Sequence, residues 1–173
     1  MASFELISAV QDYEKYISNN GINEQVIDAY CEAIKTAVTN EKDIEYGLKI
    51  SKRCKEIIET FCIDTSGGTI WDLEKYAFKE KVSYEIIEKF YSVLLIEAQN
   101  KVVDSFFRYI EHKREPKERF YMPRRKQFLK IGLMDALQGM IDDKYDILCV
   151  SLIPGAGKTT IEKFFNAAVI GWF

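Results

Sequence analysis

The stretch DILCVSLIPGAGKTTIEKFFNAAVIG, residues 146–171, decides how this sequence is interpreted. It opens with a short apolar run, Asp146–Ser151, whose continuous hydrophobicity predicts a strand buried on both faces of a parallel sheet. A glycine-containing turn follows, and the apolar residues from Ile161 to Ile170 predict a helix. The order of strand, glycine turn, Lys-Thr and helix is the arrangement that phosphate binding requires.

Each residue type in the turn has a physical role in such a site. Glycines allow backbone N–H groups to converge on an anion, and a helix N-terminus adds the positive end of its dipole. Lys158 would supply a full charge to the β- and γ-phosphates of ATP, and the Thr159 hydroxyl would bind Mg²⁺. We therefore predict a phosphate-binding loop of the Walker A type, with Lys158 in the catalytic role, formed by Pro154, Gly155, Ala156, Gly157, Lys158, Thr159 and Thr160. The alternative is a chance turn before a helix.

One position departs from the full motif, which has glycine where this chain has Leu152. The match is therefore to the shortened form GxGK[ST]. The missing glycine argues against small kinases and GTPases, and it is tolerated in helicase-like and translocase-like ATPases.

The residues before this stretch predict a helical bundle over residues 1–112, because apolar residues recur at helical spacing between short turns. Asn40 is a plausible N-cap of a third helix, and a short helix is expected around Trp71–Phe78. Ser83 is expected to cap one long helix that continues through Ile110. A further amphipathic helix is predicted over Gln127–Met140.

Charge is distributed unevenly along a chain of net charge −3. Residues 108–130 carry nine basic and three acidic residues, so this segment has a charge of +6. Two of the three prolines lie within residues 113–125, which we interpret as a basic linker between the helical domain and a second domain, 126–173. The segment either contacts phosphate groups or is a solvated connector.

Several classes of site and protein are disfavoured. The four cysteines form no CxxC pair, so reduced buried thiols are expected rather than zinc ligands. His112, in a charged run, is expected to be solvated. No apolar run approaches the ~20 residues that cross a bilayer, and the N-terminus has no secretory pattern, so a cytoplasmic location is expected.

The segment 120–173 resembles the start of the ATPase domain of tailed-phage terminase large subunits, whose genes are also found in prophages. The resemblance rests on Pro123-Arg124-Arg125, an amphipathic helix, a predicted strand and the loop 151–160. It implies a motor that packages double-stranded DNA into procapsids in a bacterial host cell, with ATP and Mg²⁺ as cofactors. It also implies a small terminase subunit and a portal protein as partners, and a second domain that cuts DNA. Self-association is a further expectation.

The resemblance also suggests where adenine binds. The family's adenine-contacting motif corresponds to residues 123–127, which makes Arg125 and Gln127 candidate nucleotide ligands. The alternative for Gln127 is an exposed residue in the first turn of a helix. Many terminases carry an arginine inside the loop, and Leu152-Ile153-Pro154 has none, so a transition-state arginine would come from elsewhere or from a neighbouring subunit.

The expected fold is therefore mostly α: a helical bundle followed by the first strand, loop and helix of a truncated α/β P-loop ATPase domain. The only acidic residue after Lys158 is Glu162, so no Walker B acids follow the loop, and we expect this chain alone to be inactive as an ATPase or nuclease. Two alternatives remain open. One is another nucleic-acid ATPase of helicase-like or AAA type, and the other is a helical docking module with an ATPase start attached.

Overall fold

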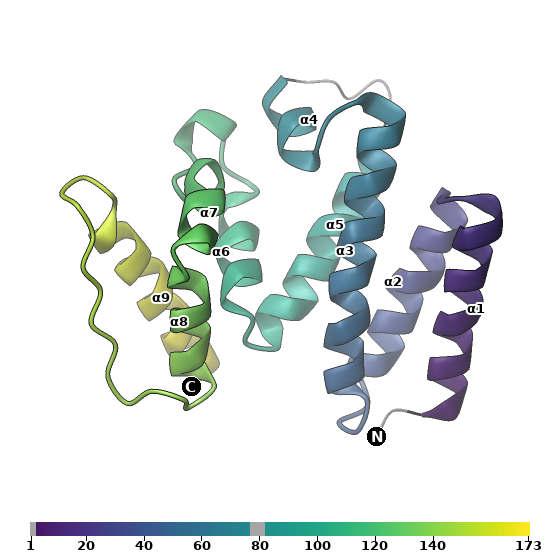
Figure 1. Cartoon of the computed structure of the whole chain (residues 1–173), viewed down its shortest axis with the longest axis horizontal. Coiled ribbons are helices and arrows are strands. Elements are labelled where there is room, and N and C mark those ends of the chain that lie inside the picture. Colours follow the sequence, from purple (N-terminus) through teal and green to yellow (C-terminus); the bar gives the residue numbers. More distant parts are fainter. Residues whose placement is uncertain (1–2, 77–81) are drawn as a thin grey trace. The chain divides into compact units, whose positions relative to one another are not determined.

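The computed structural model describes residues 3–76 and 82–173, which form helices grouped into two compact units (Figure 1). The first unit is Met1–Ile96 and the second is Glu97–Phe173. The mostly helical character is confirmed. The strand predicted at the start of the decisive stretch, over residues 146–151, is not formed within the described residues. A strand needs hydrogen bonds to a neighbouring strand, and the described residues contain no second one.

The first unit contains α1 (Phe4–Asn20), α2 (Glu24–Val38), α3 (Ile44–Ser66), α4 (Ile70–Tyr76) and most of α5 (Tyr84–Gln99). Short polar side chains begin the first two helices: the Ser3 hydroxyl accepts from the N–H of Leu6, and the Asn23 side chain accepts from that of Val26. In Figure 1 the first three helices lie side by side and alternate in direction.

Two details of this unit differ from the expectations. Asn40 is not the N-cap of the third helix, which begins at Ile44, because the Asn40 amide instead donates to Asp43 Oδ2 at 2.8 Å within the preceding turn. The predicted short helix is present as α4, and Phe78 lies outside the described residues.

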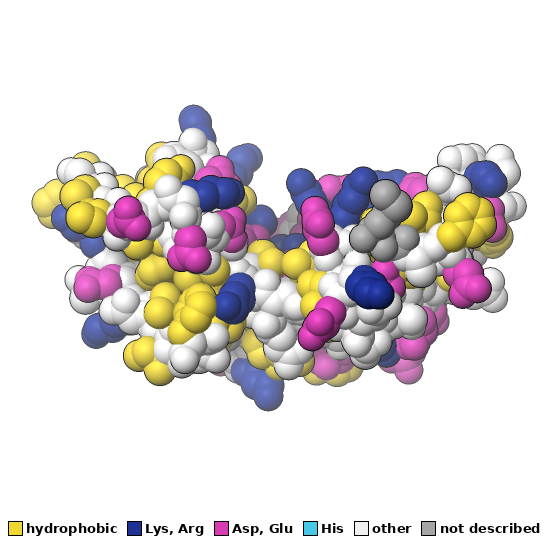
Figure 2. Space-filling model, turned by 90° about the horizontal axis from the view of Figure 1, so that it is seen from below, with side chains coloured by type: hydrophobic (Ala, Val, Ile, Leu, Met, Phe, Trp, Pro, Cys, Tyr) yellow, Lys and Arg dark blue, Asp and Glu magenta, His cyan; other side chains and the backbone are white. Residues whose placement is uncertain are grey.

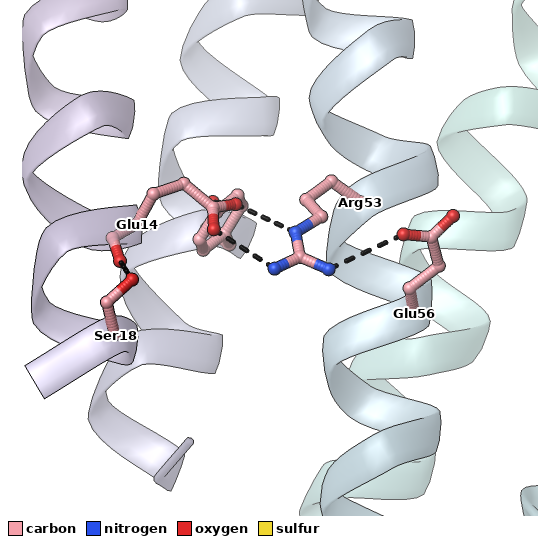
Figure 3. A network of polar contacts seen from close by, with 5 residues as sticks. Glu14, Ser18, Arg53 and Glu56 are labelled. Carbon is pink, nitrogen blue, oxygen red and sulfur yellow. Dashed lines mark hydrogen bonds and ion pairs between the residues drawn. The ribbon is translucent and has the colours of Figure 1, made fainter. Parts of the chain in front are cut away.

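The core of the first unit is apolar, with fully buried Ile27, Ile34 and Ile57 on the facing sides of α2 and α3. A polar network joins α1 to these two helices (Figure 3). The Glu14 carboxylate accepts from the Tyr30 hydroxyl at 2.5 Å and from Arg53 Nε and Nη2 at 2.8 and 3.0 Å. Arg53 Nη1 also lies 3.5 Å from Glu56 Oε2. This network fixes α1 against the rest of the unit.

The second unit contains α6 (Val103–Glu111), a 3-10 turn (Pro116–Glu118), α7 (Tyr121–Lys130), α8 (Leu133–Ile141) and α9 (Lys158–Trp172). Its core joins all four α-helices through Phe107, Tyr121, Phe128, Leu137 and Phe164. The Phe107 ring packs edge-on against both Tyr121 and Phe164, at centroid distances of 5.2 and 5.5 Å.

The long helix predicted from Ser83 to Ile110 is wrong, because the chain breaks between α5 and α6. Lys101 adopts a positive φ of 65° there. The side chain of Gln138, from α8, stabilises this break. It accepts from the N–H of Val103 at 2.9 Å and donates to the carbonyl of Lys101 at 3.0 Å. These long-range contacts satisfy backbone groups that a continuous helix would have paired internally.

The single helix predicted over Gln127–Met140 is also wrong. It is divided into α7 and α8 at Gly132, whose φ of 72° is left-handed and closes the first of the two helices.

The division into units falls between Ile96 and Glu97, and residues 113–125, expected to be a linker, lie inside the second unit. The buried Glu111 carboxylate explains how they are held. It accepts from the backbone N–H groups of Phe120, Tyr121 and Met122 at 2.7, 2.9 and 3.0 Å, and so caps the start of α7. Arg119 donates to the carbonyls of His112 and Arg114, which closes the connection.

Candidate phosphate-binding site

The predicted loop lies between an extended segment and the start of α9. Its turn spans Pro154–Gly157, and the N–H of Ala156 donates to the carbonyl of Ile153 at 3.2 Å. Both glycines are left-handed, with φ of 79° at Gly155 and 86° at Gly157. The helix begins at Lys158, as the motif predicts.

The N-terminus of α9 has no side-chain cap. The carbonyl of Gly157 accepts from the N–H groups of Thr160 and Ile161, both at 3.1 Å. Helix geometry leaves the N–H groups of Lys158 and Thr159 without intrahelical acceptors, and the helix dipole favours an anion at this end. Lys158 and Thr159 are exposed, so a phosphate group can reach both.

An aromatic side chain packs against the loop. A Cβ added to Gly157 would lie 1.8 Å from Cζ of Phe120, so the Phe120 ring lies directly against this glycine. The Arg124 guanidinium lies over the same ring, 4.4 Å from its centroid, and donates to the Phe120 carbonyl at 3.1 Å. The Phe120 ring therefore contacts both Gly157 of the loop and the Arg124 guanidinium, and so joins the start of α7 to the loop.

The two residues predicted to contact adenine lie in different surroundings. The Arg125 guanidinium forms a two-point ion pair with Asp104 on α6, at 2.7 and 2.8 Å, and the Tyr121 hydroxyl donates to the same carboxylate. Gln127 is exposed on α7. The residues 154–160 are thus gathered at one helix end, whereas the Arg125 side chain is directed to α6.

The basic segment is less available than its charge suggested. Arg108 and Arg119 are buried, and Arg125 is paired with Asp104. The exposed basic side chains of the segment are Lys113, Arg114, Lys117, Arg124, Lys126 and Lys130, and they are interleaved with exposed Glu115 and Glu118. His112, expected to be solvated, is half-buried, and its Nδ1 lies 2.6 Å from the Tyr109 carbonyl.

A cavity of about 350 Å³ opens beside the loop, within the second unit. The extended segment forms one wall and helices α8 and α9 form the others, with Lys158 and Glu162 at its polar side. Its apolar lining residues are Leu133, Leu137, Met140, Leu148, Val150, Leu152, Ile161 and Phe165.

Other candidate features are weaker. In the described ranges, no group of three or more histidine, cysteine or acidic side chains is placed to hold a metal ion, and no helix is long and apolar enough to cross a membrane. Three cysteines are buried as predicted, but Cys149 is exposed, because the segment that carries it is not covered by a sheet.

Sequence reasoning missed Phe120, Asp104 and Glu111. The first supports the loop, the second holds Arg125 and the third caps α7. None lies at a motif position, and their roles depend on contacts between distant parts of the chain. The only available signal was the aromatic residue beside Pro123-Arg124-Arg125.

Searches against protein-family models, curated proteins and solved structures found no match to this chain.

Proposed function

We propose that the loop 154–160 binds the phosphates of ATP together with Mg²⁺, and that residues 120–173 are the start of an ATPase domain similar to that of tailed-phage terminase large subunits. The observation that carries the proposal is the coincidence of the GAGKTT sequence with a two-glycine turn ending at an uncapped helix N-terminus. Backbone N–H groups at such an end are anion ligands, and Lys158 adds the charge that a triphosphate needs.

The pattern of exposed and cavity-lining residues along the extended segment supports the proposal that it belongs to an α/β domain. Alternate residues Leu148, Val150 and Leu152 line the cavity, whereas Ile147 and Ile153 are 80% and 73% exposed. A period of two is the side-chain pattern of a strand. In this proposal, the segment becomes the strand before the loop once neighbouring strands pair with it.

The Mg²⁺ ion would take the Thr159 hydroxyl as its protein ligand. Mg²⁺ in nucleotide sites retains water and phosphate oxygens and uses only one or two protein groups, so one hydroxyl donor fits an ion brought in with the nucleotide. When bound, the ion would neutralise phosphate charge, and Lys158 would add a second positive charge to the same phosphates.

Nucleotide affinity of Lys158→Ala tests the proposal. Losing a charge-assisted contact costs about 1.5–3 kcal/mol, which is roughly a 10- to 150-fold rise in the dissociation constant for ATP with Mg²⁺. Lys163→Ala is the matched control, because Lys163 is exposed on the same helix beyond its first turn, and its affinity should equal that of the wild type. Equal affinities for wild type and Lys158→Ala would exclude the loop as the site.

A second candidate function concerns the first unit. Residues 1–96 form a compact unit with its own core, which favours a helical docking module for another component of a packaging machine. Binding of the full chain to a small terminase subunit or a portal protein, abolished by surface substitutions on α1 but not on α9, would support it. Binding abolished by α9 substitutions alone would assign docking to the second unit.

A further inference from the structure

The segment before the loop has a sequence that is nearly symmetric about Val150. Residues 147–153 read Ile-Leu-Cys-Val-Ser-Leu-Ile. Residues at equal distances from Val150 are identical in two of the three pairs, and the third pair, Cys149 and Ser151, differs by one atom. A segment with this symmetry has nearly the same order of side chains in both chain directions, so two antiparallel copies place like residues opposite each other.

The segment is also extended, with strand-like alternation. Its even-numbered residues line the cavity, although Val150 is 41% exposed, and its odd-numbered residues, Ile147, Cys149, Ser151 and Ile153, are exposed. Figure 2 shows one face of the molecule with uncovered hydrophobic side chains, and the exposed large apolar residues of the second unit include Ile147, Val150 and Ile153. Large apolar side chains without cover are typical of a surface that binds another chain.

The backbone of the segment offers an open edge. In the described part of the chain, the N–H and C=O groups of residues 147–152 make no hydrogen bonds to other backbone groups. A row of such groups in an extended segment is a template for adding a strand.

Charge favours an antiparallel partner with the same sequence. Asp142, Asp143 and Asp146 precede the segment, with Lys144 among them, and Lys158 is the first charged residue after it. Antiparallel pairing of two copies therefore brings the acidic end of each segment towards Lys158 of the other copy. Parallel pairing would place like charges together instead.

We propose that two copies of this chain associate by antiparallel pairing of residues 147–153 about a two-fold axis at Val150. In this register Ile147 of one copy lies opposite Ile153 of the other, so the two most exposed large apolar residues of the segment cover each other. The contact is isologous and closes after two copies. The strand pairing itself involves residues 147–153, and Lys158 of the phosphate loop contributes its charge by facing the acidic residues of the other copy.

Cysteine cross-linking tests the register, in a Cys149→Ser background that removes the native exposed thiol. Val150→Cys places two thiols on the axis, about 5 Å apart at Cβ, and a mild oxidant should link most of the chains as dimers. Ile147→Cys is the matched control. It is more exposed, but its two copies would be six residues out of register, about 20 Å apart, and should stay monomeric. Equal cross-linking at both positions would overturn the proposal.

Sedimentation of the uncross-linked chain gives a second, independent test. The wild type and Ser151→Ala should sediment as dimers, whereas Ser151→Pro, which removes one N–H donor, should sediment as a monomer. Hydrogen exchange of residues 147–153 is measured on the same samples. A wild-type monomer overturns the proposal, whatever its exchange rate. Slow exchange in a monomer would mean that another segment of the same chain pairs with residues 147–153. Fast exchange would mean that these residues have no pairing partner.

Discussion

Arg124 and Arg125 are neighbours on α7, but only Arg125 is tied to a carboxylate. Its partner Asp104 also accepts from the Tyr121 hydroxyl. Burial raises the pKa of Asp104, but the hydrogen bond and charge of Arg125, together with the charge of Arg108 and the hydrogen bond from Tyr121, outweigh burial, so the pKa is lowered overall. Burial and the adjacent carboxylate raise the pKa of Tyr121. The ion pair between Arg125 and Asp104 therefore holds α7 against α6.

Removing either charge of this ion pair leaves the other charge half-buried and without its oppositely charged partner in the pair. We expect Asp104→Asn and Arg125→Met each to lower the free energy of unfolding by about 2–4 kcal/mol, measured by denaturant titration. Arg124→Met should change it by less than about 0.5 kcal/mol, because Arg124 is exposed. Similar losses at both arginines would show that Arg125 is not specifically structural.

Glu14 predicts a dependence of stability on pH. The hydrogen bond from Arg53 lowers its pKa below 4.5, against an opposing effect of burial and with help from Tyr30. A carboxyl whose pKa is lower in the folded state stabilises fully above its unfolded pKa and loses that effect as pH falls. The stability difference between wild type and Glu14→Gln should therefore be constant above about pH 5.5 and shrink below about pH 4.5. A difference that does not change with pH would contradict this account.

At the scale of elements, the junction between the extended segment and α9 depends on Gly157. Its φ is left-handed, and the Phe120 ring occupies the space that a Cβ would need. We expect Gly157→Ala to destabilise the chain by about 2–4 kcal/mol, the sum of about 1 kcal/mol of backbone strain and a steric clash.

Two further variants separate these causes. In Gly155→Ala the added Cβ meets open space, so only the backbone cost of about 1 kcal/mol should appear. In a Phe120→Ala background, Gly157→Ala should likewise lose its steric cost and retain the backbone cost. A cost at Gly157 that is unchanged without the ring would show that the clash is relieved elsewhere. Unfolding titrations of the four variants provide the measurement.

The sequence predicts helices well in this chain, because amphipathic spacing is local. It also predicts the turn and the first residue of α9, since GAGKTT sets both together. It does not predict the breaks at Lys101 and Gly132. At the first, the deciding group is Gln138, more than thirty residues away in the chain. The strand over 146–151 depends on partners outside the segment, which periodicity cannot supply.

At the scale of the whole molecule, the two units can be observed separately, because each contains one of the two tryptophans. Trp71 lies on α4 of the first unit, and Trp172 lies on α9 of the second. Single-tryptophan variants, Trp71→Phe and Trp172→Phe, would each report unfolding of one unit by fluorescence.

We expect substitutions to act only within their own unit. Arg53→Met should shift the transition seen by Trp71 and leave that seen by Trp172 unchanged, and Asp104→Asn should do the reverse. Combined, their costs should add to within about 0.5 kcal/mol, because the two sites share no partner. Shifts of both signals by either substitution would show that the chain unfolds as one cooperative body.

The burial of three of the four thiols leaves this chain with one site for selective chemical labelling. Cys31, Cys54 and Cys62 are buried, and burial raises the pKa of Cys62 to about 11, so its nucleophilic thiolate is scarce at neutral pH. Cys149 alone is exposed, a few residues before the loop. A maleimide dye would therefore attach at one defined position in the folded wild-type chain, where its emission would respond to a nucleotide or a second chain arriving beside it.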